Sequence, residues 1–307
     1  MKVIVGASTF ADQDKTPIAL LESAGVEVRL NPLGRRWTET EAIELLQGVD
    51  GLLAGLEPLN RTVLAATEGR LKALARIGIG MDNVDQNAAR EMGIKVSNTP
   101  DAPTAAVTEM TLAALLCLAR ELEPMNREMH AGAWPKTISR SLRELTVLVV
   151  GFGRIGRAVA AQLSALGCSI LVTDPFLTEA SQCPFPVVSL ADGLRNADVI
   201  SLHASGSGVL LGDLEFTAMK PGMILLNPAR GGLVDEAALG RALDSGQVAK
   251  AWLDTFGQEP YTGGLRKYPQ VLMTPHACTY TRECRRSMES EAVINLLRDL
   301  GLSTKAP

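Results

Sequence analysis

The chain has 307 residues, which is more than one hydrophobic core usually organises, so we expect two domains. Its composition is that of an ordinary globular protein, and its net charge of −4, with acidic and basic residues interspersed, argues against a nucleic-acid partner. No apolar run reaches the roughly 18 residues of a membrane span, so we expect no membrane partner either.

The cysteines, the histidines and the N-terminus bear on the cellular location. Five cysteines are scattered along the chain without a CxxC pair, and only three histidines are present. We therefore expect neither a metal site nor a disulfide framework, and a reducing cytoplasm fits best. The segment Met1–Phe10 has too short an apolar core for a signal peptide and is interpreted as a first strand.

Short apolar runs alternate with segments of helical periodicity along nearly the whole chain, which predicts parallel sheets covered by helices. In the first hundred residues the expected strands are Lys2–Ala7, Val26–Leu30, Gly51–Ala54, Leu71–Ile77 and Ile94–Ser97. The helical segments that separate them are Pro17–Ala24, Thr40–Gln47, Arg61–Thr67 and Val84–Met92. A long apolar helix, Thr104–Leu122, is expected after the break at Pro100–Pro103.

A second series of strands and helices begins at Thr146. Its expected strands are Thr146–Val150, Ser169–Thr173, Val199–His203, Met223–Asn227, Ala249–Leu253 and Val271–Thr274. Six strands in that order match a doubly wound nucleotide-binding sheet. The last helical stretch, Arg282–Leu300, is expected to pack back on the first domain. We therefore predict an α/β fold of two Rossmann-like, doubly wound parallel-sheet domains, with a discontinuous first domain (1–99 and 283–307) and a second domain at 100–282.

A glycine fingerprint lies at the start of the second series. The run Val147–Gly156 has the form G-x-G-x-x-G directly after a strand and at the beginning of a helix. Gly151 permits the tight turn, Gly153 lets a pyrophosphate approach the backbone, and Gly156 lets the helix sit close to the strand. The phosphates would lie over the N–H groups of the helix start, where Arg154 could add positive charge.

An acidic residue strengthens the interpretation of this turn as a cofactor site. Asp174 ends the next strand, 18 residues after Gly156, where a carboxylate can accept hydrogen bonds from the ribose hydroxyls of the cofactor. A carboxylate there would repel a 2′-phosphate, which favours NAD over NADP. The alternative is an aspartate that only caps a turn, and the joint pattern favours the cofactor.

Polar residues follow three later strands, at sheet ends where open α/β folds place their ligands. Arg230 could hold a substrate carboxylate with two parallel hydrogen bonds, while Gly231 and Gly232 would give the backbone room near a ligand. His276 ends another strand and is a natural acid/base near neutral pH, and Glu259 is the best candidate to fix its tautomer. Taken singly, these residues could also be a solvated arginine, a satisfied core histidine and a loop-capping glutamate.

Four motifs in order resemble the D-isomer-specific 2-hydroxyacid dehydrogenase family over the whole chain. They read Gly-Phe-Gly-Arg-Ile-Gly, Asn-Pro-Ala-Arg-Gly-Gly-Leu-Val-Asp, Leu-Asp-Thr-Phe-(x)2-Glu-Pro and Thr-Pro-His. The segments Ile79–Asp85 and Asn98–Val107 make the match closest to the phosphoglycerate dehydrogenase branch. The resemblance implies a flavodoxin-like substrate domain followed by an NAD-binding domain.

The resemblance also implies a role for each matching residue. Arg230 would bind the substrate carboxylate and the C2 oxygen, and His276, paired with Glu259, would take the hydroxyl proton while a hydride passes from C2 to the nicotinamide. The loop Gly78-Ile79-Gly80 of the first domain would supply N–H groups to the same carboxylate, in a cleft between the domains. The remaining cofactor contacts implied by the family are Arg154, Ile155, His203, Ala204, Pro228, Ala229 and, at the nicotinamide end, Asp254.

The chain departs from the family pattern in places that concern the cofactor and the substrate. Ala204–Gly208 replaces the usual Pro-Leu-Thr stretch after His203, and Thr108 stands in a Val-Ala-Glu motif. A phosphorylated acid needs further cations, for which Arg76 and Lys136 are the candidates. The strand around Ala54 lacks an arginine that related phosphoglycerate enzymes commonly have.

3-Phosphoglycerate is therefore the favoured substrate, with glycerate/hydroxypyruvate or glyoxylate as the alternative and phosphite as a remoter one. An NAD-sensing interaction protein of the same fold is the alternative from another class, but it need not retain Arg230, Glu259 and His276 together. The apolar helix from Thr104 to Leu118 resembles the dimer-forming segment of the family, so we expect a homodimer. No regulatory domain is expected beyond Pro307.

Overall fold

The computed structural model describes residues 1–177, 183–206 and 208–303. The chain divides into two compact units, Met1–Pro103 with Tyr280–Pro307 and Thr104–Thr279. Ser207 of the Ala204–Gly208 stretch and residues 304–307 of the expected first domain lie outside the described residues.

The first unit is built on a five-stranded parallel sheet. Its strands are β1 (Lys2–Val5), β2 (Glu27–Arg29), β3 (Gly51–Ala54), β4 (Ala73–Arg76) and β5 (Lys95–Ser97). The helices between them are α1 (Thr16–Ser23), α2 (Glu39–Leu45), α3 (Arg61–Ala65) and α4 (Gln86–Glu91). The strand order β2-β1-β3-β4-β5 is that of flavodoxin, as expected. The order reverses between β1 and β3, which is where folds of this type place ligands.

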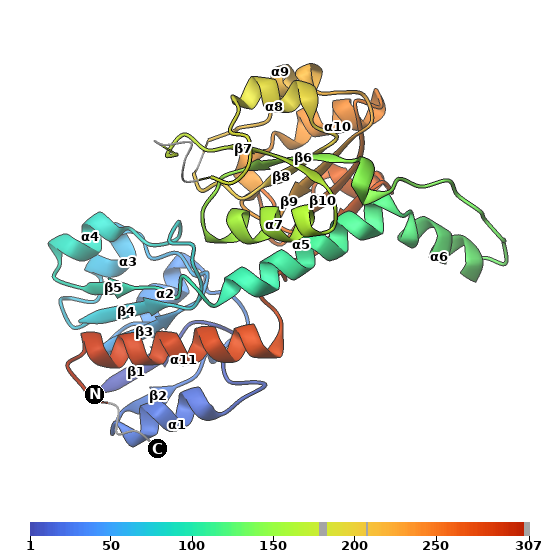
Figure 1. Ribbon diagram of the computed structural model, residues 1–307. Coiled ribbons are helices and arrows are strands. Elements are labelled where there is room, and N and C mark those ends of the chain that lie inside the picture. Colours follow the sequence, from blue (N-terminus) through green and yellow to red (C-terminus); the bar gives the residue numbers. More distant parts are fainter. Residues whose placement is uncertain (178–182, 207, 304–307) are drawn as a thin grey trace. The chain divides into compact units, whose positions relative to one another are not determined.

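The last helix of the chain, α11 (Arg282–Asp299), belongs to the first unit. It packs against β3, β4, β5 and α1, and lies across the sheet in Figure 1. The Thr281 hydroxyl caps its start by accepting a hydrogen bond from the Cys284 N–H. Its inner face buries Met288, Val293 and Leu296. The expectation that the final helix returns to a discontinuous first domain is therefore confirmed.

The second unit holds a six-stranded parallel sheet with helices on both faces. Its strands are β6 (Thr146–Val150), β7 (Ser169–Thr173), β8 (Val199–Leu202), β9 (Met223–Asn227), β10 (Val248–Leu253) and β11 (Val271–Met273), in the order β11-β10-β9-β8-β6-β7. The helices are α5 (Pro103–Ala119), α6 (Leu122–His130), α7 (Arg154–Ala165), α8 (Leu190–Asn196), α9 (Asp213–Ala218) and α10 (Glu236–Asp244).

The alternation of side chains along the strands produces one apolar core on each face of this sheet. Val147 and Val149 of β6 join the core made with α5 and α7, whereas Leu148 and Val150 join the core made with α8, α9 and α10. Figure 1 shows these two groups of helices on opposite sides of the strands. Strands buried on both faces explain the unbroken apolar runs of the sequence.

The edge of this sheet lies at β7, because β8, the next strand along the chain, pairs with the opposite side of β6. Among the described residues, the chain outside β7 forms only an isolated parallel bridge between Val172 and Val187. Pro184 and Pro186 carry no N–H and limit this segment to a bridge, which is why the sequence shows no strand pattern there.

The expected helix Thr104–Leu122 is divided in the structure. α5 ends at Ala119, and Glu121 takes a left-handed conformation (φ +56°) before α6 begins at Leu122. The Lys250 ammonium, from β10, donates a hydrogen bond to the Leu118 carbonyl at 2.7 Å and also contacts the Glu121 carboxylate. A cation at the end of a helix satisfies its last carbonyl groups and stabilises the break there.

None of the helices in the described part of the chain is both long enough and apolar enough to cross a bilayer.

The packing of α11 generates a stability prediction. Leu296→Ala removes a side chain that is 0% exposed and lies beside β3, so the free energy of unfolding should fall by about 2–5 kcal/mol. Ile294→Ala on the same helix, where the side chain is 48% exposed, should change it by less than about 1 kcal/mol. Urea denaturation of both variants measures the difference, and equal effects would contradict the packing.

Candidate functional site

Two glycines of the turn after β6 are required by the packing of the protein itself. Gly151 has φ +90°, and a Cβ there would lie 2.7 Å from the backbone of His203 and Ala204. A Cβ on Gly156 would lie 2.0 Å from the Gly151 carbonyl oxygen. Both positions therefore exclude any larger residue, and the turn and the first turn of α7 are pressed together.

The middle glycine has a different environment, which fits a bound phosphate group. Gly153 precedes α7, and no other atom lies within 4 Å of the position its Cβ would take. No side chain caps the helix, so the N–H groups of Arg154, Ile155 and Gly156 face this open side. Such a helix start attracts anions. These residues fit the pyrophosphate of a dinucleotide.

Asp174 lies directly beside this turn, because β7 and β6 are neighbours. Its carboxylate accepts hydrogen bonds from the Phe152 N–H at 2.7 Å and from the Phe176 N–H at 2.8 Å. The turn-capping contacts considered from the sequence are thus present. Each oxygen keeps further acceptor capacity, so the same carboxylate could also accept bonds from ribose hydroxyl groups.

His203 and Ala204 follow β8 and contact the glycine turn from the other side. The His203 Nε2 lies 2.8 Å from the Ser201 hydroxyl. Burial lowers the pKa of His203 to about 3, so its ring is neutral at pH 7. A neutral ring places no additional charge beside the proposed phosphate site.

His276 and Glu259 come from the loops after β11 and β10 and lie in contact. The His276 Nδ1 is 2.9 Å from the Glu259 Oε2, and the other carboxylate oxygen accepts a hydrogen bond from the Phe256 N–H at 3.1 Å. Both side chains are partly exposed, at 38% and 27%. The arrangement leaves Nε2 as the ring nitrogen that can exchange a proton with a ligand.

Asp254 organises the backbone on which His276 stands, which the sequence did not reveal. Its buried carboxylate accepts hydrogen bonds from the Thr274 hydroxyl (2.6 Å) and from the N–H groups of Ala277 (2.9 Å) and Cys278 (3.1 Å). The Asp254 carbonyl also accepts the His276 N–H at 2.8 Å. These bonds hold His276 at φ +52°, a conformation that non-glycine residues rarely adopt.

Arg230 follows β9, the strand next to β10. Its side chain donates a hydrogen bond to the Ala229 carbonyl at 2.7 Å. Asn227 fixes the local turn, because its amide donates to the Arg230 carbonyl at 2.8 Å and its oxygen accepts from the Ala229 N–H at 3.1 Å. Pro228 and Ala229 are half-buried within this turn. The guanidinium is thereby placed at the same sheet edge as the loop of Glu259.

The two glycines after Arg230, Gly231 and Gly232, have different surroundings. A Cβ on Gly231 would lie 1.9 Å from the carbonyl carbon of Phe256, whereas nothing lies within 4 Å of a Cβ on Gly232. The room at Gly231 therefore serves the protein's own backbone rather than a ligand, which corrects the expectation for that residue. The close approach locks the Arg230 turn onto the loop that carries Glu259.

The substrate residues expected in the first unit lie after β4. Arg76 is only 8% exposed and donates to the Ile77 carbonyl. Gly78 has φ +136°, and its N–H donates to the Thr99 hydroxyl at 2.8 Å. The Ile79 carbonyl accepts from the Asn98 amide at 2.8 Å, which pins the loop before Gly80. Since the N–H of Gly78 is already used, only those of Ile79 and Gly80 remain candidates for a ligand.

Among the residues that the structure describes, no group of three or more histidine, cysteine or acidic side chains could hold a metal ion.

Comparison with known proteins gives a consistent set of relatives. Residues 112–278 match the sequence profile described as "D-isomer specific 2-hydroxyacid dehydrogenase, NAD binding domain". The chain is 38% identical over 252 residues to D-3-phosphoglycerate dehydrogenase 3, chloroplastic, of Arabidopsis thaliana (78% of this chain, 43% of that protein). It is 36% identical over 241 residues to hydroxypyruvate reductase of Thermotoga maritima (76% and 78%).

Among solved structures, the TT0316 protein of Thermus thermophilus is similar over 100% of this chain and 99% of that one, with a TM-score of 0.89 and 34% identity. The chain spans less than half the length of the plant relative.

The contact at Gly231 generates a prediction with its neighbour as the control. Gly231→Ala forces the Arg230 turn away from Phe256 and should lower the free energy of unfolding by about 3 kcal/mol or more. Gly232→Ala meets open space and should change it by less than about 0.5 kcal/mol. Chemical denaturation distinguishes the two, and a stable Gly231→Ala protein would refute the close approach.

Proposed function

The chain belongs to the D-isomer specific 2-hydroxyacid dehydrogenase family, and on that premise we propose that it transfers a hydride between NAD and C2 of a 2-hydroxy acid or its 2-oxo counterpart. The observation that carries this proposal is the pair of His276 and Glu259, 2.9 Å apart, on the strand ends next to Arg230. An acid/base, its orienting carboxylate and a carboxylate-binding guanidinium are the groups that this chemistry needs.

His276 acts as the acid/base in this proposal. Glu259 on Nδ1 keeps a proton there, so Nε2 accepts the proton of the substrate hydroxyl as the C2 hydride departs, and returns it to the oxygen in the reductive direction. The carboxylate also stabilises the imidazolium that forms. NAD, when bound, supplies the hydride acceptor for oxidation and, in its reduced form, the donor for reduction.

Arg230 binds the carboxylate and the C2 oxygen of the substrate, which orients C2 and lowers the cost of charge on that oxygen. We assign the N–H groups of Ile79 and Gly80 to the same carboxylate and leave out that of Gly78, because it donates to Thr99. Asp254 positions His276 through the backbone, and the family pattern assigns Asp254 to the nicotinamide end of the cofactor.

The cofactor is held, in this proposal, by the turn of Gly151, Gly153 and Gly156 with its ribose on Asp174. The remaining contacts follow the family pattern and come from Arg154, Ile155, His203, Ala204, Pro228 and Ala229. The Asp174 carboxylate disfavours a 2′-phosphate, which supports NAD rather than NADP.

Two substrate classes come from the names of the relatives. Because the chain is slightly more identical to the phosphoglycerate dehydrogenase than to the hydroxypyruvate reductase, 3-phosphoglycerate is the first substrate to test and hydroxypyruvate is the second. A protein that only senses NAD would need none of Arg230, Glu259 and His276, so their assembly at one sheet edge favours an enzyme.

Turnover with a panel of 2-oxo acids and NADH tests the proposal. His276→Ala should lower kcat by about 10²- to 10⁴-fold, the usual contribution of general acid–base catalysis, while NADH affinity measured by fluorescence stays unchanged. Glu44→Ala, at an exposed position on α2, should leave kcat as it is. Absence of turnover with every acid, or an unchanged kcat for His276→Ala, would refute the proposed chemistry.

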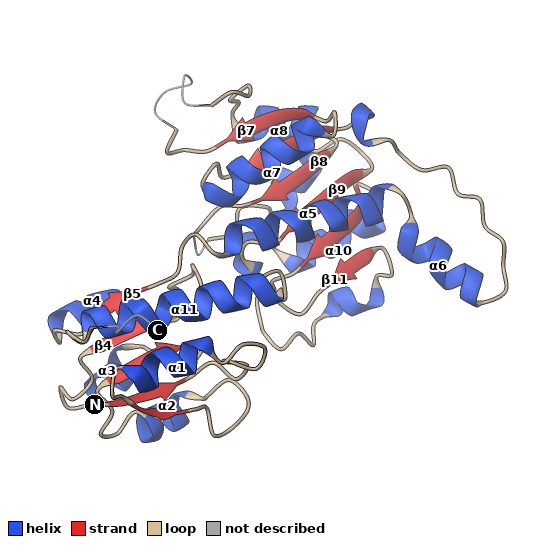
Figure 2. Cartoon of the chain, turned by 60° about the horizontal axis from the view of Figure 1, so that its bottom comes forward, coloured by secondary structure: helices blue, strands red, loops and turns tan. Residues whose placement is uncertain are grey.

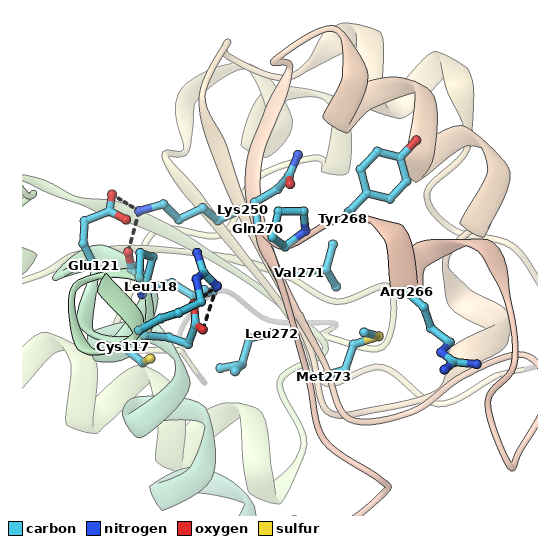
Figure 3. A pocket seen from close by; sticks show the side chains of 14 residues that line it. Cys117, Leu118, Glu121, Lys250, Arg266, Tyr268, Gln270, Val271, Leu272 and Met273 are labelled. Carbon is cyan, nitrogen blue, oxygen red and sulfur yellow. Dashed lines mark hydrogen bonds and ion pairs between the residues drawn. The ribbon is translucent and has the colours of Figure 1, made fainter. Parts of the chain in front are cut away.

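We also propose that the protein is a homodimer assembled through α5, α6 and the segment that follows. α6 buries none of its own side chains, and Trp134 and Ile138 beyond it are 77% and 98% exposed. A cavity of about 470 Å³ opens where α5 and α6 meet β11, lined by Cys117, Leu272 and Met273 among others (Figure 3). Figure 2 shows α6 and its loop extending away from the sheet of this unit. The cavity is lined by apolar and charged side chains together, and the exposed apolar side chains beside it fit a second copy of the chain.

Sedimentation equilibrium checks the oligomeric state. The wild-type protein should sediment with the mass of two chains at micromolar concentration, and Trp134→Asp with Ile138→Asp should give the mass of one. Leu214→Asp, at an 82% exposed position on α9, should leave the dimer intact. A monomeric wild type would end the proposal.

A cytoplasmic location is part of the proposal as well. All five cysteines are free thiols, and four of them are buried in the fold, as a reducing compartment allows.

A further inference from the structure

Glu236, which the proposed reaction does not use, connects α10 to the loop that carries Glu259. It is the first residue of α10. One carboxylate oxygen, Oε1, accepts a hydrogen bond from the Gly257 N–H at 3.1 Å, and the other, Oε2, accepts one from the Tyr261 hydroxyl at 2.8 Å. These two donors lie two residues before and two residues after Glu259. A single side chain therefore holds the loop on both sides of the residue that pairs with His276.

Tyr261 is packed within the same loop. Its ring stacks on that of Phe256 with the centroids 4.2 Å apart, and a Cβ on Gly263 would lie 2.5 Å from its hydroxyl oxygen. That oxygen also accepts the Leu265 N–H at 3.1 Å. Burial raises the pKa of Tyr261 to about 12, and the hydrogen bond to Glu236 adds to the rise. The phenol therefore keeps its proton at pH 7 and donates a hydrogen bond to α10.

The backbone of this loop determines where the Glu259 carboxylate lies. Its Oε1 accepts the Phe256 N–H at 3.1 Å, and its Oε2 lies 2.9 Å from the His276 Nδ1. Phe256 is the neighbour of Gly257, which Glu236 holds. Because Glu259 itself is partly exposed, the position of its carboxylate depends on the backbone that carries it.

On the basis of the proposed function, we propose that Glu236 is a positioning residue for the reaction, which holds the loop so that the Glu259 carboxylate meets the His276 Nδ1. Acid–base catalysis by a histidine depends on a carboxylate that fixes its tautomer and orientation. A displacement of about 1 Å in such an arrangement can lower the rate by about 10²-fold. Tyr261 is the second part of the same device, because it presents the loop's hydroxyl to Glu236.

Three substitutions separate the position of the loop from the charge of Glu236. Glu236→Ala removes both contacts. Glu236→Gln keeps an oxygen for the Gly257 N–H, and its amide N–H can donate to the Tyr261 oxygen, so the loop stays held while the charge is lost. Tyr261→Phe removes one contact and keeps the ring that stacks on Phe256.

Glu215 supplies a matched control. It also lies at the start of a helix of this unit, α9, and its Oε2 accepts the Gly212 N–H at 3.0 Å. Glu215→Ala removes a comparable hydrogen bond that involves no residue of the Glu259 loop.

The test measures kcat for reduction of a 2-oxo acid by NADH, per binding site counted by fluorescence titration with NADH. Glu236→Ala should lower kcat by about 10- to 100-fold, and Tyr261→Phe by about 3- to 10-fold. Glu236→Gln and Glu215→Ala should each change it by less than about threefold. The affinity for NADH should be the same in all four variants.

The pH dependence of kcat distinguishes a displaced Glu259 from a general loss of stability. Reduction needs the imidazolium form of His276, so kcat falls as the pH rises and the ring loses its proton. Without the Glu259 carboxylate on Nδ1 the imidazolium is less stable, so this fall should occur about one pH unit lower in Glu236→Ala. The Asp254 carboxylate, which accepts the N–H groups that follow His276, is retained in every variant.

An unaltered kcat, or an unaltered pH profile, in a folded Glu236→Ala protein overturns the inference. So does a Glu236→Gln protein that is as impaired as Glu236→Ala. If melting curves show that Glu236→Ala does not fold, a wild-type kcat in Tyr261→Phe overturns it instead. Absence of turnover by the wild-type protein with every 2-oxo acid points to failure of the proposed function, and the inference falls with it.

Discussion

The buried carboxylate of Asp254 is the group on which the arrangement of the site depends. A buried carboxylate is costly unless its oxygens are hydrogen-bonded, and here the donors are the Thr274 hydroxyl and the N–H groups of Ala277 and Cys278, on either side of His276. Satisfying this one charge folds the chain after β11 into a tight loop and holds His276 in the left-handed region. The imidazole then contacts Glu259 through Nδ1.

Close approach of backbone segments at glycines brings the other strand ends together. At Gly151 and Gly156 the missing Cβ lets a turn, a helix and the end of β8 meet, and at Gly231 it lets the Arg230 turn meet the backbone of Phe256. Gly153 and Gly232, in contrast, face open space. Glycines of the first kind hold the scaffold, and those of the second kind leave its surface accessible to a ligand. Neighbouring glycines of one motif are thus required for different physical reasons.

Charge is distributed differently in the two units. The second unit presents an open helix start, a neutral His203 and the guanidinium of Arg230, which suits the anionic groups of a dinucleotide and a carboxylate. The first unit instead buries an acid, Glu57, beyond the ends of β1 and β3, and this burial raises the pKa of its carboxyl group.

The sequence by itself determined the α/β class, most strand positions within a residue or two, and the order of the motifs, because strand periodicity and turn glycines are local signals. It placed Glu259 and His276 as a pair, which lies at 2.9 Å in the structure. Only the tertiary structure decided three other features. Lys250 arrives from a distant strand at the break near Glu121, and the Thr99 hydroxyl accepts the Gly78 N–H. Glu57 is buried against two glycines, Gly6 and Gly55. Each of these depends on which donor or charge arrives from far along the chain, and that information exists only after folding.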